Sequence, residues 1–451
     1  MRHQQPDEFA KLLDATGVAR AQRELIAAEG GTKSFVRGLY GCSEMLVDGF
    51  IDLFRAGILR RRVYPHALLQ SLLDAERLEV AISEDTLRTL NDAGLAQLTA
   101  RDFSELQQAG LFRDDVRFES GSIIDAYGHV VPATLADSEI RAELAKNFLG
   151  KSLRNGVLLH GGFFFGPKSF YSALRELPDD QRRQFAMQRI SFINELYGAD
   201  QALKVAQRRL ARFVNTTMMV TGLGAAVSDG LADGRVVSGV GGQYNFVAMA
   251  HALPDARSIL CLRSTRTSAG RTTSNIVWNY GHVTIPRHLR DIIVTEYGIA
   301  DLRSRTDGEV VEALIQVMDA RFQDGFAAAA KRSGKLRDDY HVPDSARRNT
   351  PQRLEEILRP YRARGLFGDL PFDGDFTADE IVIGKALTHL QTITRSPWSR
   401  TMTIAKALLF QRQNAAIRRY LERLALDSPA SFTEFIEQRL VALALSRFAP
   451  K

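Results

Sequence analysis

The sequence predicts an α/β protein with a largely parallel sheet, followed by a helical C-terminal extension. Two observations predict the sheet: short β-branched runs recur between residues 156 and 330, and stretches with helical spacing separate them. Strands that alternate with helices are typical of parallel sheets, because a helix usually forms the crossover between parallel strands. We therefore expect residues 156–330 to form one α/β layer structure. A third observation predicts the extension: helical patterns follow the polar segment at residues 331–353.

Composition and length indicate a soluble, multi-part protein. The chain has 451 residues, 45% of them apolar and 25% charged, which predicts one large domain with an extension, or two to three domains. The sequence contains no run of 18 apolar residues, so it predicts no membrane helix. The first residues lack the pattern of an export signal. Cys42 and Cys261 are isolated, as in proteins of a reducing compartment, and form no zinc-ligand spacing. We expect a cytoplasmic protein without a membrane partner.

The net charge of +6 admits two interpretations. Arg60–Arg62 is the single compact basic run, and it predicts a solvated face. The sequence has no nucleic-acid-binding motif, so nucleic acid is not expected as a partner. A mildly basic enzyme that acts on anionic small molecules fits the same charge.

The N-terminal third predicts a helix and then an insertion. Leu46, Phe50 and Leu53 recur at helical spacing. Ser43 is the predicted N-cap, which would place Glu44 in or beside the first turn. Residues 65–155 are mixed and polar, and they predict short helices at 83–94 and 100–110 in an insertion or a small lid.

The remaining elements follow from the same patterns. The β-branched runs predict strands at residues 157–160, 235–240, 257–262 and 291–298. Helical spacing predicts helices after Pro167, at 308–318, and in the extension at 383–394, 402–426 and 431–448. We assign residues 1–335 to an α/β domain with an insertion at about 65–155, and residues 345–451 to the extension.

A glycine cluster is the first candidate for a binding site. In "SGVGGQYNF", residues 238–246, three glycines occur within four positions, between a predicted strand and a predicted helix. Such a unit offers backbone N–H groups and a helix N-terminus to an anion. The spacing is neither a dinucleotide fingerprint nor a P-loop. A tight turn that packs the helix on the strand is the alternative.

Two carboxylates and two histidines are the further candidates. Glu44 could be catalytic, although an acid at a helix start is favoured by the helix dipole alone. Glu296 follows a predicted strand, where sites of α/β proteins gather, and a hydrogen-bonded structural acid is the alternative. His160 and His282 adjoin glycines and could act as acid or base. No G-x-S-x-G occurs, which disfavours a hydrolase with a nucleophile elbow.

Three stretches taken together resemble the acetyl-CoA hydrolase/transferase family, part of the family I CoA-transferase superfamily. The family's T-E-M-x-S-D-G stretch is matched by Ser43, Glu44, Met45, Asp48 and Gly49. Its G-x-G-G-Q-x-D-F loop is matched by Gly239, Gly241, Gly242, Gln243 and Phe246, and its V-T-E-Y-G-I-A-x-L signature by residues 294–302. The departures from the family pattern are Asn245 in place of Asp, and Arg263, Arg271 and Asn275.

The resemblance implies a reaction and its participants. Glu44 would be the nucleophile that carries CoA as a glutamyl thioester, and the loop at Gly239, Gly241, Gly242 and Gln243 would lie along CoA and help supply an oxyanion donor. Acyl-CoA and a small carboxylic acid would be the substrates, with no permanently bound cofactor and no metal. The implied function is a CoA-transferase or an acyl-CoA hydrolase.

The resemblance also implies a missing part. Family members carry a related α/β domain before the glutamate, which supplies part of the acyl-CoA cleft and is absent from this sequence. We therefore expect a homo-oligomer or a partner that carries the missing domain. A non-catalytic CoA-binding remnant or subunit is the alternative function.

Overall fold

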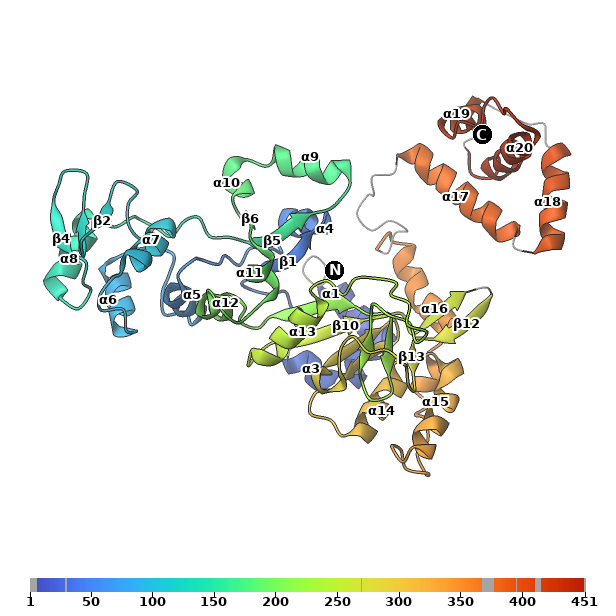
Figure 1. The fold of residues 1–451 in the computed structure, drawn as a ribbon, viewed down its shortest axis with the longest axis horizontal. Coiled ribbons are helices and arrows are strands. Elements are labelled where there is room, and N and C mark those ends of the chain that lie inside the picture. The colour runs from blue at the N-terminus through green and yellow to red at the C-terminus, as the bar shows by residue number, and fades with distance from the viewer. Residues whose placement is uncertain are drawn as a thin grey trace. The chain divides into compact units, whose positions relative to one another are not determined.

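The computed structural model describes residues 6–28, 31–268, 270–366, 377–394, 396–409 and 415–449. The chain divides into two compact units, residues 1–368 and 369–451. The first unit mixes helices and strands, and the second is drawn as helices (Figure 1). This confirms an α/β fold followed by helices. The sequence places the boundary near residues 335–345, whereas the structure retains helix α16 in the first unit, where it contacts α1.

The elements run along the chain as follows. The helices of the first unit are α1 (Pro6–Thr16), α2 (Val18–Ala21), α3 (Arg23–Ala28), α4 (Gly49–Arg55), α5 (Ala67–Asp74), α6 (Glu84–Asp92), α7 (Ala100–Gln108), α8 (Ser138–Asn147), α9 (Lys168–Glu176), α10 (Asp179–Arg182), α11 (Ile190–Asn194), α12 (Gln201–Gln207), α13 (Gln243–Ala252), α14 (Asp307–Gln316), α15 (Ala320–Arg332) and α16 (Pro351–Arg362), with 3-10 turns η1 (Arg287–Leu289) and η2 (Ala346–Arg348). The strands are β1 (Gly41–Leu46), β2 (Arg117–Glu119), β3 (Ser122–Ile124), β4 (Val130–Pro132), β5 (Leu159–Phe164), β6 (Phe185–Met187), β7 (Arg212–Thr216), β8 (Met219–Thr221), β9 (Ala226–Val227), β10 (Arg257–Cys261), β11 (Thr265–Ser268), β12 (Arg271–Ser274), β13 (Ile276–Val277), β14 (Ile292–Thr295) and β15 (Gly298–Asp301).

One sheet has the strand order β15-β14-β10-β7. Its strands β7, β10 and β14 are parallel, and β15 returns antiparallel to β14. Helix α13 packs on β7 and β10, and α14 packs near β15 (Figure 1). The shared core includes Val247, Leu260, Ile293, Val310 and Leu314, each 5% exposed or less. The strand at 257–262 and the helix at 308–318 were predicted from this apolar spacing and are confirmed. The strand predicted at 291–298 is confirmed over β14, but a turn at residues 296–297 ends it and leads into β15.

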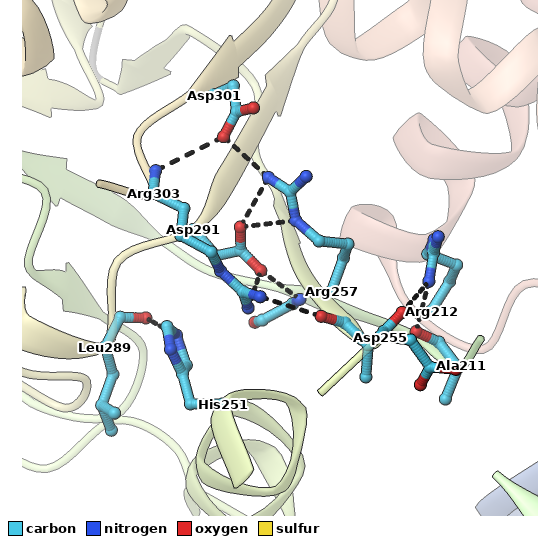
Figure 2. Close-up of polar contacts among 11 residues, drawn as sticks. Ala211, Arg212, His251, Asp255, Arg257, Leu289, Asp291, Asp301 and Arg303 are labelled. Carbon is cyan, nitrogen blue, oxygen red and sulfur yellow. Dashed lines mark hydrogen bonds and ion pairs between the residues drawn. The ribbon is translucent and has the colours of Figure 1, made fainter. Parts of the chain in front are cut away.

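A buried ion network links β10, β14 and β15 at one edge of this sheet. Figure 2 shows the carboxylate of Asp291, just before β14, between Arg257 of β10 and Arg303. Asp291 also accepts a hydrogen bond from the Ser258 N–H at 2.6 Å, and Arg257 donates a second bond to Asp301 at 2.7 Å. The side chain of Asp291 is 1% exposed. Since an unpaired buried charge is costly, these contacts help to fix the register of the strands.

A second, separate sheet has the parallel order β1-β5-β6. Helices α4 and α9 cover its core, and α11 contacts both β1 and β5. Further strands form β13-β8-β9 and the hairpin β11-β12. The strands between residues 156 and 330 therefore belong to several sheets, and the prediction of one layer structure is wrong. Local periodicity identifies a strand but does not identify its partner, which is why β5 could pair with the distant β1.

Residues 65–155 fold around a core of their own. Helices α5–α8 and the sheet β2-β3-β4 enclose a cluster that includes Leu87, Leu106 and Phe112, each fully buried. Capping boxes at Ser83 and Thr99 begin α6 and α7, so both predicted short helices are confirmed. Pro167 likewise precedes α9 as predicted. The description of this region as an insertion stays a prediction.

The strand predicted at residues 235–240 is wrong. Apart from an isolated bridge between Gly230 and Val236, this segment is irregular in the structure. Val236 and Val237 are 75% and 52% exposed, so their branched side chains face solvent rather than a sheet core. β-Propensity without burial does not make a strand.

The second unit consists, within its described residues, of α17 (Ala378–Ile393), α18 (Pro397–Leu409), α19 (Ala415–Arg423) and α20 (Phe432–Leu445). Helices α17, α19 and α20 enclose a small core with Tyr420 and Leu445 at its centre, and α18 packs on α20. The helices predicted at 383–394 and 431–448 are confirmed. The pattern at 402–426 belongs to two helices, and residues 410–414 between them lie outside the described residues.

Candidate active site

Glu44 lies on strand β1 and not at a helix start. The helix that follows begins at Gly49, and the Asp48 side chain accepts a hydrogen bond from the Gly49 N–H, so Ser43 is not its N-cap. The predicted helix was therefore correct in kind but was placed too early. The reason is that Leu46 belongs to the core of the β1-β5-β6 sheet, which extends the strand through this residue. Glu44 is half-buried.

The glycine cluster meets this carboxylate. The Gly242 N–H donates a hydrogen bond of 3.1 Å to Glu44 Oε2, although 198 positions separate the two residues. Gly242 is the N-cap of α13, so its N–H stands at the positive end of that helix. A Cβ atom at Gly242 would lie 2.6 Å from Glu44 Cδ, and therefore only glycine permits this approach. Gly241 has φ +57°, which glycine adopts at low cost.

The other two loop residues lie differently. The Gln243 side chain donates a hydrogen bond of 3.0 Å to the Thr216 carbonyl at the end of β7, which ties the start of α13 to the carboxyl edge of the sheet. Gly239 has no atom within 4 Å of the position that a Cβ would occupy. The structure thus brings Gly242, with Gly241 beside it, against Glu44, and leaves Gly239 open.

A second donor to Glu44 is Asn194, which sequence reasoning missed. The Asn194 amide donates a hydrogen bond to Glu44 Oε1, while Gly242 holds Oε2. Asn194 is the last residue of α11, a short helix packed on β1. An asparagine at a helix end is ordinary in sequence terms, so no local pattern could have identified it. The two donors hold both oxygens of one half-buried carboxylate.

Glu296 matches the structural alternative. Its two oxygens accept hydrogen bonds from the Ser264 N–H at 2.8 Å and the Ser264 hydroxyl at 2.7 Å. These bonds fix the segment that follows β10 to the end of β14. Glu296 therefore stabilises a loop, and Glu44 is the carboxylate that faces the glycine cluster.

The two histidines are each held by a neighbour. His282 Nε2 lies 2.9 Å from Asp229, and His160 Nδ1 lies 2.5 Å from the Tyr40 hydroxyl. Burial, together with the positive charge of Arg208, lowers the pKa of His160 to about 4. His160 is therefore neutral at pH 7.

The buried His160 predicts a pH-dependent stability. As the pH falls below about 6.5, His160 binds a proton in the unfolded chain, whereas in the folded chain it stays neutral until about pH 4. The free energy of unfolding therefore decreases as the pH falls through this window. The shift predicts a loss of roughly 3 kcal/mol in the free energy of unfolding. Urea unfolding of the wild type and of His160→Gln at neutral and at mildly acidic pH measures it. The variant should lack this part of the loss, and parallel curves for the two proteins would contradict the assignment.

Comparison with known proteins identifies the region around this site. Residues 166–330 match the family described as acetyl-CoA hydrolase/transferase C-terminal domain. This part of the chain is similar to the C-terminal domain of that family. The domain contains the glycine cluster and Asn194, whereas Glu44 precedes the matched range.

Curated relatives of the domain carry CoA-transferase names. The chain is 39% identical over 101 residues to a probable butyrate:acetyl-CoA coenzyme A-transferase of Syntrophomonas wolfei, and 35% identical over 103 residues to a butyryl-CoA:acetate CoA-transferase of Anaerostipes caccae. Each match covers 22% of this chain and 23% of the relative.

Among solved structures, RipA from Yersinia pestis is 27% identical over 39% of this chain and 37% of that chain, with a TM-score of 0.34. A 4-hydroxybutyrate CoA-transferase from Porphyromonas gingivalis is 16% identical over 61% of this chain and 58% of that chain, with a TM-score of 0.30.

The described residues were also compared with what a membrane span and a metal site require. No helix among them combines the length and the apolarity that a membrane span requires. In the same residues, no group of three or more His, Cys, Asp and Glu side chains is arranged to hold a metal ion.

Proposed function

We propose that the protein transfers CoA from an acyl-CoA to a small carboxylic acid, or hydrolyses acyl-CoA, through a thioester on Glu44. The observation that carries this proposal is the meeting of Glu44 with the Gly242 N–H and the Asn194 amide. The carboxylate is half-buried, both of its oxygens are oriented, and it lies against the glycine cluster of a CoA-transferase C-terminal domain. We propose Glu44 as the catalytic residue and Gly239, Gly241, Gly242 and Gln243 as the CoA-binding loop.

The reaction begins with the carboxylate as nucleophile. A Glu44 oxygen attacks the thioester carbonyl, the C–S bond breaks, and an acyl-glutamyl anhydride and CoA thiolate result. The thiolate then attacks the glutamyl carbonyl and releases the first carboxylate, which leaves CoA as a thioester on Glu44. An acceptor carboxylate reverses both steps, and the exchange consumes no net proton. Water in place of the acceptor gives hydrolysis.

Each step passes through a tetrahedral oxyanion. In the structure Gly242 and Asn194 donate to the resting carboxylate, and the same donors stand next to the carbon that carries the oxyanion when CoA thiolate attacks the glutamyl group. Donors that are already oriented cost no reorganisation during the reaction. The missing side chain at Gly242 also leaves space for the reacting group, since a Cβ would overlap the carboxylate.

Removal of the Asn194 amide should slow the reaction. The loss of one oriented donor predicts a fall in kcat of about 10- to 1000-fold for Asn194→Ala. The KM for acyl-CoA should change less, because the donor contacts Glu44 rather than substrate. Asn215→Ala is the matched control, because it removes the same kind of side chain from a half-exposed position on β7. Equal rates for Asn194→Ala and the control would contradict the role of Asn194.

The substrates and partners follow from the same proposal. We propose acyl-CoA and a small carboxylic acid as substrates, a cytoplasmic location, and a homo-oligomer or a further chain that completes the cleft. The alternative function is CoA binding without turnover, by a remnant or subunit that needs a separate N-terminal domain.

The experiment that tests the function supplies butyryl-CoA and isotope-labelled acetate to the purified chain. Labelled acetyl-CoA, detected by mass spectrometry, is the expected product of transfer, and free CoA formed without acetate would indicate hydrolysis. Binding of CoA by calorimetry without either product would support the alternative. The proposal would be contradicted if this chain, also as an oligomer, neither bound CoA nor formed either product.

A further inference from the structure

A buried arginine lies behind the candidate active site. Arg208 caps the C-terminus of α12, and it is 3% exposed. Its guanidinium donates to the Phe192 carbonyl and to Met249 Sδ at 2.9 Å, and it reaches Cys42 Sγ at 3.8 Å. It also lies over the Phe192 ring, 5.7 Å from the centroid.

These contacts reach the three elements that carry the site. Cys42 lies on β1 two positions before Glu44, so both side chains leave the same face of the strand. Phe192 lies on α11 two positions before Asn194. Met249 lies on α13 seven positions after Gly242, which is about two helical turns. One guanidinium therefore joins the strand of the carboxylate to the helices of both of its donors.

The charge of Arg208 makes a purely structural role costly. Among the described residues no carboxylate contacts its guanidinium. An unpaired buried charge destabilises a protein, and an apolar side chain would fill the same space more favourably. What the guanidinium provides, and an apolar side chain does not, is a rigid fork of several donors.

We propose that Arg208 is a positioning residue that holds β1, α11 and α13 in the arrangement in which Gly242 and Asn194 meet Glu44. The consequence for catalysis rests on the proposed function of Glu44, whereas the consequence for geometry does not.

Lys204 supplies a matched control within the same helix. It is 2% exposed, lies 5.8 Å from the centroid of the Phe192 ring, and donates to the Ser191 carbonyl at 3.2 Å. Its burial resembles that of Arg208, but these two side-chain contacts reach only α11. Loss of Lys204 therefore removes a buried cation without removing the link to β1 and α13.

The first measurement follows the Gly242–Glu44 hydrogen bond without substrate. Gly31, Gly162 and Gly242 are the glycines that follow another glycine in the sequence, so labelling glycine with ¹³C at the carbonyl and with ¹⁵N isolates their amides by NMR. Arg208→Met should accelerate hydrogen exchange at Gly242 by at least about tenfold relative to the wild type. Exchange at Gly162, within β5, should not change, and Lys204→Met should leave Gly242 unchanged.

The second measurement is kinetic. Arg208→Met and Arg208→Lys should both lower kcat by at least about tenfold with little change in the KM for acyl-CoA. A lysine keeps the charge, but its compact ammonium lacks the rigid planar fork that reaches Phe192, Met249 and Cys42 together. Lys204→Met should retain kcat within about threefold. Should Arg208→Met fail to fold, Arg208→Lys provides both measurements.

Three outcomes would overturn the proposal: wild-type exchange at Gly242 in both Arg208 variants, wild-type kcat in Arg208→Lys, or equal losses in Lys204→Met and Arg208→Met. Failure of the proposed function is recognised separately. An inactive wild-type protein would contradict the proposed function. The hydrogen-exchange measurement would still test the role of Arg208, because it uses no acyl-CoA.

Discussion

Glu44→Gln should lower the rate of CoA transfer by about 10³-fold or more while the protein stays folded. The amide has nearly the size of the carboxylate and can still accept the Gly242 N–H, but it is a very poor nucleophile and cannot form the anhydride. The isotope-exchange assay measures the rate, and circular dichroism with thermal unfolding measures the fold. The stability should change little, because the amide oxygen can accept the Gly242 N–H and the amide NH2 can donate to the Asn194 side-chain oxygen once the Asn194 amide turns over.

Glu296→Gln is the matched control for this substitution. Glu296 also receives two hydrogen bonds at a strand end, but both come from Ser264 in a loop. We expect a moderate loss of stability and a rate within about threefold of the wild type. A full rate in Glu44→Gln, or a larger loss in Glu296→Gln, would assign the nucleophile to another group.

Gly242→Ala should lower the rate by about 100-fold or more through a single methyl group. The backbone of Gly242 has φ −82°, which alanine adopts without strain, so the effect comes from the side chain alone. The added Cβ would lie 2.6 Å from Glu44 Cδ, and the carboxylate must move out of the reach of its donors. The rate and the amount of glutamyl thioester that chemical trapping detects measure the loss.

Gly239→Ala is the control in the same loop. A Cβ there meets no atom within 4 Å, so the structure predicts a folded protein in which Glu44 keeps its geometry. Because Gly239 belongs to the proposed CoA-binding loop, KM could rise, whereas kcat should stay within about threefold. Equal losses of kcat at Gly239 and Gly242 would contradict the contact that we assign to Glu44.

The site residues could be predicted from the sequence only because several stretches were considered together. Glu44, the glycine cluster and the segment at 294–302 are each weak alone, and it was their resemblance to one family that joined Glu44 to the loop. The contact between Glu44 and Gly242 agrees with that expectation. The local structure of Glu44 was mistaken because its neighbours Leu46 and Phe50 have helical spacing, although one belongs to a strand and the other to a helix.

Other parts of the site depend on tertiary contacts that no local pattern contains. Asn194 and Arg208 contact residues far along the chain, and both are ordinary at helix ends. The exposed valines at 236 and 237 predicted a strand because propensity carries no information on burial. Helices with caps and apolar stripes, such as α6, α7 and α14, were predicted correctly because their determinants are local.

The central claim is that Glu44 carries the CoA during the reaction, and chemical trapping tests it most directly. The protein is incubated with acyl-CoA, treated with borohydride, and digested for mass spectrometry. Borohydride reduces a glutamyl thioester to an alcohol, so we predict a reduced side chain at Glu44 in the wild type and none in Glu44→Gln. Turnover with Glu44 unmodified, or a reduced carboxylate at another position, would contradict the account.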